Sequence, residues 1–172
     1  MIEVQTLNQN TMISDFLSER MRCLEANRFI TVSFCGLKGS RRLWKSDINE
    51  TKTLFDLYGK RLSYEAFGRS RNLDRSPGEF LPVIAMPEYK TKSGDETYLH
   101  YHIVAKFPLN KAVKLSIFTH RFFKNMGVRH LSSLPDVNIK EAVRSEKAVG
   151  YSLKNIEDSF TVENTTFVGL VH

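Results

Sequence analysis

Residues 98–107 form the stretch YLHYHIVAKF, whose aromatic and β-branched residues predict a β-strand over Tyr98–Phe107. The stretch FLPVIAMPEY at Phe80–Tyr89 has the same character and predicts a second strand. Between them, KTKSGDET contains Ser93-Gly94-Asp95, a sequence that favours a tight turn. We therefore predict that the two strands form a hairpin.

The remainder of the chain alternates helical and extended patterns around this hairpin. Further strands are predicted at Arg28–Cys35, Val137–Ile139 and Thr166–Val171. Helices are predicted at Ser14–Ala26, from a cap at Ser46 through Leu62, at Asn110–Asn125 with Val113, Ile117 and Phe118 facing inward, and at Ser145–Ile156, with a loop at Gly68–Glu79. These elements predict one α+β domain over residues 1–172, with a central, mainly antiparallel sheet of about five strands flanked by helices.

Composition excludes several classes of protein. Apolar residues make up 41% of the 172 residues, which argues against disorder over the whole length. No apolar run approaches the roughly 20 residues of a membrane helix, so no membrane partner is expected. The two cysteines, Cys23 and Cys35, are too few for a disulfide scaffold. The net charge of +6 suits a polyanionic partner, of which nucleic acid is the commonest.

His100 and His102 are the most informative pair of residues. Side chains alternate across a strand, so both imidazoles share one face, roughly 7 Å apart, while Tyr101 points into the core. Two imidazoles on one face can converge on a metal ion, although pairs of surface histidines without metal are also common. Glu88 ends the preceding strand and can complete a ligand set, with Glu79 and Glu96 as rival carboxylates. Mixed nitrogen and oxygen ligation suits Mn²⁺, or with less preference Mg²⁺.

A second motif is Tyr151-Ser152-Leu153-Lys154, within a predicted helix. Residues three positions apart share a helical face, so Tyr151 and Lys154 project together. A phenol is a weak nucleophile at neutral pH, and a neighbouring ammonium with a metal-polarised phosphate would help it attack. Most tyrosines in such pairs only pack against the core.

Two segments are candidates for DNA contact. Lys38–Lys45 combines the cations Lys38, Arg41, Arg42 and Lys45 with Trp44, which can stack on an unpaired base. His120–His130 adds Arg121, Lys124 and Arg129. Either segment can also be a solvated basic surface.

Taken together, these motifs resemble the HUH endonuclease superfamily, and within it the single-tyrosine rolling-circle replication initiator (Rep) proteins. RFITVSFCG resembles the first Rep motif, LHYHIV the His-hydrophobic-His motif, and AVGYSLKNI the Tyr-x-x-Lys motif. Their order and spacing follow the family over residues 28–156.

The resemblance implies a nuclease domain with a central antiparallel sheet, related to ferredoxin-like and RNA-recognition folds. It implies that His100, His102 and Glu88 hold Mn²⁺ or Mg²⁺, that Tyr151 attacks single-stranded or hairpin origin DNA, and that Lys154 supports the site. The product would be a free 3′-OH and a 5′-phosphotyrosine link, so that strands can be rejoined without ATP.

The sequence has no phosphate-binding loop of the form G-x-x-x-x-G-K-[ST], so strand separation would depend on a host helicase, followed by a host polymerase, or on a longer form of the protein. Localisation would be cytoplasmic in a bacterial host and nuclear in a eukaryote infected by a virus. Three alternatives stay open: a single-tyrosine transposase of the same superfamily, a non-catalytic nucleic-acid-binding module with a ferredoxin-like sheet, and a mononuclear iron oxygenase.

Overall fold

A computed structural model of the chain describes residues 15, 19, 25–68, 81–91, 93–142 and 166–168. Within these residues the elements follow the order β1 (Arg28–Ser33), α2 (Ile48–Phe67), β2 (Val83–Lys90), β3 (Glu96–Ala105), α3 (Ala112–Leu131), β4 (Asp136–Glu141) and β5 (Thr166–Val168). Three 3-10 turns accompany them: η1 (Leu37–Gly39), η2 (Lys45–Asp47) and η5 (Leu109–Lys111). The predicted α+β class is confirmed, with four strands of six or more residues, the three-residue β5 and two long helices.

The strands form one sheet in the order β4-β1-β3-β2-β5, and each neighbouring pair is antiparallel. The predicted hairpin joins β2 to β3. In its turn, the Thr91 backbone N–H donates to the Asp95 carbonyl at 2.8 Å, and the Gly94 N–H donates to the Thr91 carbonyl at 3.0 Å. Gly94 has a φ of 87°, which residues with a Cβ rarely adopt. This turn therefore favours glycine and helps to fix the pairing of β2 with β3.

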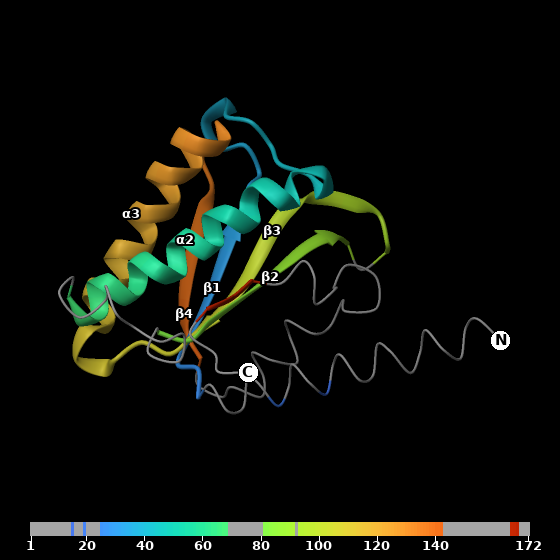
Figure 1. Cartoon of the computed structure of the whole chain (residues 1–172). Helices are drawn as coiled ribbons and strands as arrows, with labels where there is room; N and C mark the ends of the chain where they lie inside the picture. The colour runs from blue at the N-terminus through green and yellow to red at the C-terminus, as the bar shows by residue number, and fades with distance from the viewer. Residues whose placement is uncertain are drawn as a thin grey trace.

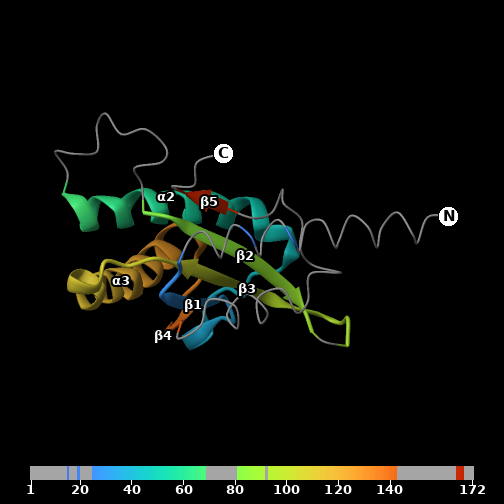
Figure 2. The same cartoon turned by 90° about the horizontal axis from the view of Figure 1, so that it is seen from below.

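Helices α2 and α3 both lie on one face of the sheet (Figure 1), and the view from below shows the same layering (Figure 2). Alternation along the strands sends Ile30 and Val32 of β1, and Leu99, Tyr101 and Ile103 of β3, into the core beneath these helices. The side chains between them point away from the helices. We call this second side of the sheet the open face.

Aromatic rings fill the space between the helices and the sheet. Phe55 of α2 lies 4.0 Å from Tyr101 and 5.1 Å from Phe123, measured between ring centroids. The Tyr101 hydroxyl is hydrogen-bonded to Thr51 at 2.7 Å, and that of Tyr58 to Thr119 at 2.9 Å. Burial raises the pKa of both phenols above their ordinary value, so these two tyrosines stay neutral.

The structure corrects two details of the predicted helices. Val113 and Ile117 were expected to face inward, but they are 76% and 48% exposed. The phase of α3 is set instead by the buried Phe122 and Phe123, which turn Leu115, Thr119 and Met126 toward the core. Phe118 does pack against the core, as predicted.

At the start of α2, Ser46 is not the capping residue, because it lies inside η2. Asp47 is the cap position of α2, and its carboxylate accepts the Trp44 backbone N–H at 2.8 Å. Most of the predicted 14–26 helix and 68–79 loop, and all of the 145–156 helix, fall outside the described residues. Among the described helices, none has the length and apolar character that crossing a membrane demands.

We expect Phe55→Ala to lower the free energy of unfolding by about 3–5 kcal/mol, because it removes the ring that joins Tyr101 to Phe123. Val113→Ala, on the exposed side of α3, should change it by less than about 0.5 kcal/mol. Urea unfolding followed by circular dichroism measures both values. Equal losses in the two variants would contradict the assignment of the core.

Candidate metal centre

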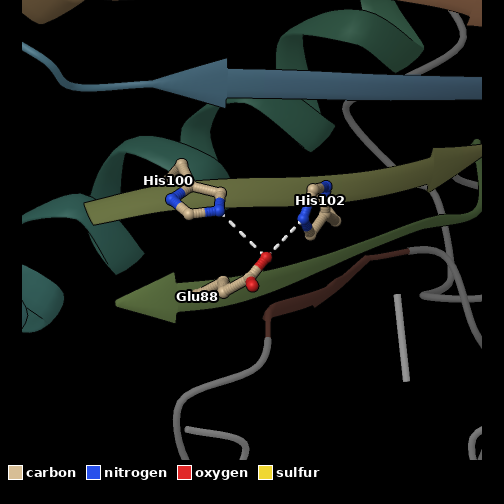
Figure 3. A group of neighbouring side chains, drawn as sticks. All are labelled: Glu88, His100 and His102. Carbon is tan, nitrogen blue, oxygen red and sulfur yellow. Dashed lines mark hydrogen bonds and ion pairs between the residues drawn. The ribbon is translucent and has the colours of Figure 1, made fainter. Parts of the chain in front are cut away.

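The hairpin register brings together the three residues expected to bind metal. Glu88 of β2 is directly opposite His100 of β3, and Met86 is opposite His102. Because side chains two residues apart share a face, both imidazoles and the carboxylate project from the open face. Figure 3 shows the three side chains converging, with Glu88 on one strand and both histidines on the next.

A single carboxylate oxygen lies between the two rings. Oε2 of Glu88 is 2.9 Å from Nε2 of His100 and 2.6 Å from Nε2 of His102. A carboxylate can only accept hydrogen bonds, so both Nε2 atoms carry the proton in this arrangement. Nδ1 of His100 lies 3.3 Å from the backbone carbonyl of Tyr98 and can donate to it.

The donor set fits a divalent metal ion. The three ligand atoms all lie within 4.8 Å of one another. An octahedral ion with bonds of about 2.1 Å holds neighbouring ligand atoms about 3 Å apart, close to the two nitrogen–oxygen distances here. Histidines that bind metal usually donate their other N–H to a carbonyl or carboxylate, as Nδ1 of His100 can to Tyr98. Glu88, His100 and His102 can therefore hold such an ion in exchange for the two Nε2 protons.

The contacts within this cluster shift the pKa values of Glu88 and His100. Burial acts to raise the pKa of Glu88, but hydrogen bonds and charge from His100 and His102 outweigh it and leave the pKa well below its ordinary value. Burial acts to lower the pKa of His100, but the bond to Glu88 and its negative charge outweigh it and raise the pKa. The carboxylate is thus ionised over the whole physiological range, ready to bind a cation.

His102 is the most buried of the three residues, with 6% of its surface exposed. Its ring stacks on that of Phe29 from β1, with centroids 5.4 Å apart and planes 23° apart. The His100 ring lies nearly perpendicular to it, at 87°. This packing restricts the His102 ring and keeps its Nε2 atom directed at Glu88.

The site lies at one side of a pocket of about 400 Å³ on the open face. The register places side chains in rows across the sheet, and the first row contains Glu88, His100, Ser33 and Asp136. The second row contains Met86, His102, Thr31 and Asn138. Both rows end on β4, so the pocket extends from the candidate ligands to the far edge of the sheet.

The other predicted site residues are only partly described. Tyr151 and Lys154 lie outside the described residues, as does the rival carboxylate Glu79. The second rival, Glu96, is exposed at the start of β3 and pairs with Lys90 rather than with the histidines. Of the three carboxylates considered, Glu88 is the one that meets the histidine pair within the described structure.

Residues 38–45, the first basic segment, are hydrogen-bonded to the backbone next to the candidate metal site. The Leu43 N–H donates to the Phe34 carbonyl at 3.2 Å, and the Leu99 N–H donates to the Leu43 carbonyl at 2.7 Å. These bonds hold residues 38–45 at the end of the sheet that carries His100. Trp44 follows directly and is 41% exposed.

The cations of this segment differ in their surroundings. Arg41 forms ion pairs with Asp47 and Glu50, and Nε of Arg42 donates to the Cys35 carbonyl at 3.2 Å. Lys38 is exposed, and Nζ of Lys45 lies 5.1 Å from the centroid of the Tyr89 ring.

Arg121 and Lys124 are exposed on α3, which covers the opposite face of the sheet from the pocket. A strand of DNA at the pocket would thus meet the 38–45 segment before it met α3. Contact of either segment with DNA stays a prediction.

Sequence reasoning did not find several pocket residues: Phe29, Thr31, Ser33, Tyr98, Asp136, Asn138 and Lys140. The available signal was alternation, because RFITVS in β1 and DVNIKE in β4 place six of these residues at every second position, and Tyr98 lies two residues before His100 in β3. That pattern gives the face but not the strand order, and the strand order is what brings β4 beside β1.

Comparisons with protein-family models, with curated proteins and with solved structures find no match. Function therefore has to be inferred from the residues of the site and their geometry.

We expect the protein to bind Mn²⁺ at this site, and Glu88→Gln or His102→Ala to weaken binding at least about 100-fold, because the first removes the negative charge of a ligand and the second removes an imidazole ligand. Titration of Mn²⁺ followed by electron paramagnetic resonance measures the dissociation constant. His130→Ala, on the exposed end of α3, is the matched control and should leave it unchanged. Unaltered affinity in a folded Glu88→Gln protein would contradict the ligand assignment.

In the metal-free protein, we expect the pairing of Glu88 with His100 to stabilise the fold most between the ordinary pKa values of the two groups. Because the pKa of His100 is higher in the folded than in the unfolded protein, its contribution to the free energy of unfolding is complete below about pH 6.5. That contribution is lost as the pH rises through the pKa of His100 in the folded protein. Because the pKa of Glu88 is lower in the folded than in the unfolded protein, its contribution to the free energy of unfolding is complete above about pH 4.5. That contribution is lost as the pH falls through the pKa of Glu88 in the folded protein. Urea unfolding of wild type and Glu88→Gln should therefore differ more at pH 5.5 than at pH 9, and an equal difference would argue against the pairing.

Proposed function

We propose that the chain is a metal-dependent single-stranded DNA endonuclease and strand-transferase of the HUH type, which nicks an origin to initiate rolling-circle replication. The observation that carries the proposal is the convergence of Glu88, His100 and His102 on the open face, beside a pocket of about 400 Å³. The net charge of +6 suits a DNA partner.

The topology supports the same function. The order β1-α2-β2-β3-α3-β4, with the sheet order β4-β1-β3-β2, is the arrangement of ferredoxin-like domains. RNA-recognition modules use the uncovered face of a four-stranded sheet to bind unpaired nucleotides. In this chain the metal ligands lie on the corresponding face, so a bound strand would pass directly over them.

Glu88, His100 and His102 would hold the metal ion and leave its other coordination positions open. When bound, a divalent ion would polarise the scissile phosphate and stabilise charge that develops on its oxygens. Two nitrogen donors favour Mn²⁺ over Mg²⁺, which prefers oxygen ligands.

We assign the nucleophile to Tyr151 on the motif that the sequence carries. Its phenolic oxygen forms a bond to phosphorus while the bond from phosphorus to the 3′ oxygen breaks, and the phenolic proton is transferred in net terms to that oxygen. The number of phosphodiester bonds is unchanged, so attack by a 3′-OH can reverse the step without ATP. Lys154, three residues further along the chain, would supply positive charge beside the phenol and the phosphate.

Trp44 and the cations Lys38, Arg41, Arg42 and Lys45 would bind the strand where it leaves the pocket, since residues 38–45 are anchored beside Leu99. Arg121 and Lys124 on α3 would contact duplex or flanking DNA on the other side. Hairpin origin DNA is the partner that we propose from the resemblance, with host helicase and polymerase acting after the nick.

A non-catalytic nucleic-acid-binding module is the second candidate, and the pocket on the sheet face opposite α2 and α3 favours it independently of any metal. In that case the histidine pair and Glu88 would be a structural hydrogen-bond cluster, and Tyr151 would have no covalent role. The two candidates differ in whether a covalent adduct forms.

We expect the protein to form a covalent adduct when it is incubated with Mn²⁺ and a pool of single-stranded hairpin DNA with randomised loops, followed on a denaturing gel. A label at the 3′ end should enter the adduct, while a label at the 5′ end should appear on a released fragment with an extendable 3′-OH. Tyr151→Phe should abolish the adduct and retain DNA binding, and Glu88→Gln should reduce it at least about 100-fold.

Two further tyrosine variants test the choice of nucleophile. Tyr64→Phe lies on α2, away from the pocket, and should leave the adduct unchanged. Tyr98 lines the pocket, so Tyr98→Phe tests whether a different phenol attacks. Loss of the adduct in Tyr98→Phe with retention in Tyr151→Phe would contradict the assignment. DNA binding with no adduct on any hairpin pool would favour the non-catalytic module.

A further inference from the structure

Strand β4 presents three polar side chains to the pocket, at the side opposite the metal ligands. Asp136, Asn138 and Lys140 alternate with Val137 and Ile139, which turn toward the core. All three line the pocket, and all three are exposed. Within the part of the chain that the structure describes, their side chains make no ion pair or side-chain hydrogen bond.

The spacing across the sheet suits one nucleotide. Asp136 lies in the same row as His100, with Ser33 of β1 between them. Adjacent strands are about 4.8 Å apart, so two steps separate the backbones of β3 and β4 by about 10 Å. This is comparable to the reach of a nucleotide from its phosphate to the far edge of its base. Thr31 and Phe29 form the floor between the two ends.

We propose that Asp136 and Asn138 recognise the base of the nucleotide whose phosphate would contact a metal ion held by Glu88, His100 and His102, and that they select guanine. This inference rests on the proposed function, because it assumes that DNA lies across the open face. It adds base specificity, which the three candidate ligands and Tyr151 do not explain.

The chemistry of the two side chains decides the base. An ionised carboxylate only accepts hydrogen bonds, and guanine is the base that presents two adjacent donors, N1–H and the N2 amino group, on one edge. The amide nitrogen of Asn138 can donate to the neighbouring O6 atom. Thymine presents two carbonyl oxygens on either side of N3–H, so its edge would face the carboxylate with like partial charge. Lys140, one row beyond Asn138, is placed to contact the next phosphate.

Charged residues on an edge strand also discourage pairing with other chains. That role needs charge on β4 but no selectivity among bases. Base selectivity therefore separates the two roles of Asp136, and Glu141 provides a matched control. Glu141 is on the same strand as Asp136, but an odd number of residues separates the two, so their side chains are on opposite faces of the sheet. The Glu141 carboxylate lies 3.6 Å from the Arg28 guanidinium and does not line the pocket.

The test uses the full chain carrying Tyr151→Phe, so that DNA binds without being cut. Selection from a pool of single-stranded hairpins with randomised loops, in Mn²⁺, followed by sequencing, should enrich guanine at one loop position. Adding Asp136→Asn should reduce that preference for guanine over thymine at least about tenfold, as expected for the loss of a paired base contact. Adding Glu141→Gln should leave the preference unchanged.

Failure of this inference is distinguishable from failure of the proposed function. The absence of guanine enrichment, or the same enrichment in Asp136→Asn, overturns base recognition by β4 and leaves the adduct assay standing. A second outcome is guanine enrichment that depends on Asp136, together with no covalent adduct in the protein that retains Tyr151. This outcome overturns the proposed nickase function and supports the base site. Aggregation of Asp136→Asn with unchanged base preference assigns Asp136 to protection of the edge and also overturns the inference.

Discussion

The pairing of β2 with β3 is the constraint on which the site depends. Glu88 meets both imidazoles because it is opposite His100 and one diagonal step from His102. The tight turn at Gly94 limits the positions at which the two strands can pair. The register shifts between Glu88 and Lys90, next to the turn. A slip of one residue would turn the Glu88 carboxylate toward the helices. A single correctly paired hairpin is therefore enough to bring the three candidate ligands together.

The alternation that places His100 and His102 on the open face also buries Tyr101 between them. The Tyr101 ring packs on Phe55, and its hydroxyl is bonded to Thr51. The strand that carries both imidazoles is therefore fixed from behind by the aromatic core, while Phe29 restrains the His102 ring from the open face. Rigid support of this kind places ligand atoms near their working positions before an ion binds, which reduces the cost of binding.

Local patterns predicted the parts of the molecule that local interactions decide. The hairpin and the shared face of the two histidines follow from period-two alternation and a glycine turn, and Glu88 follows from its place at the end of the partner strand. The predicted inward face of α3 was wrong for Val113 and Ile117. These two residues share one side of the helix, but the buried Phe122 and Phe123 turn a different side toward the core. Asp136 and Asn138 could not be assigned to the pocket, because their approach depends on strands far apart in sequence taking the order β4-β1-β3.

The two-sided use of β3 has an evolutionary consequence. Gain or loss of a single residue between Leu99 and Ile103 would exchange the faces of the strand, burying an imidazole under α2 and exposing an aromatic ring. Gain or loss of two residues would keep the faces and only displace them along the strand. Length variation among descendants of this sequence should accordingly accumulate in the turn around Gly94, whereas within the strand it should be tolerated only in even steps.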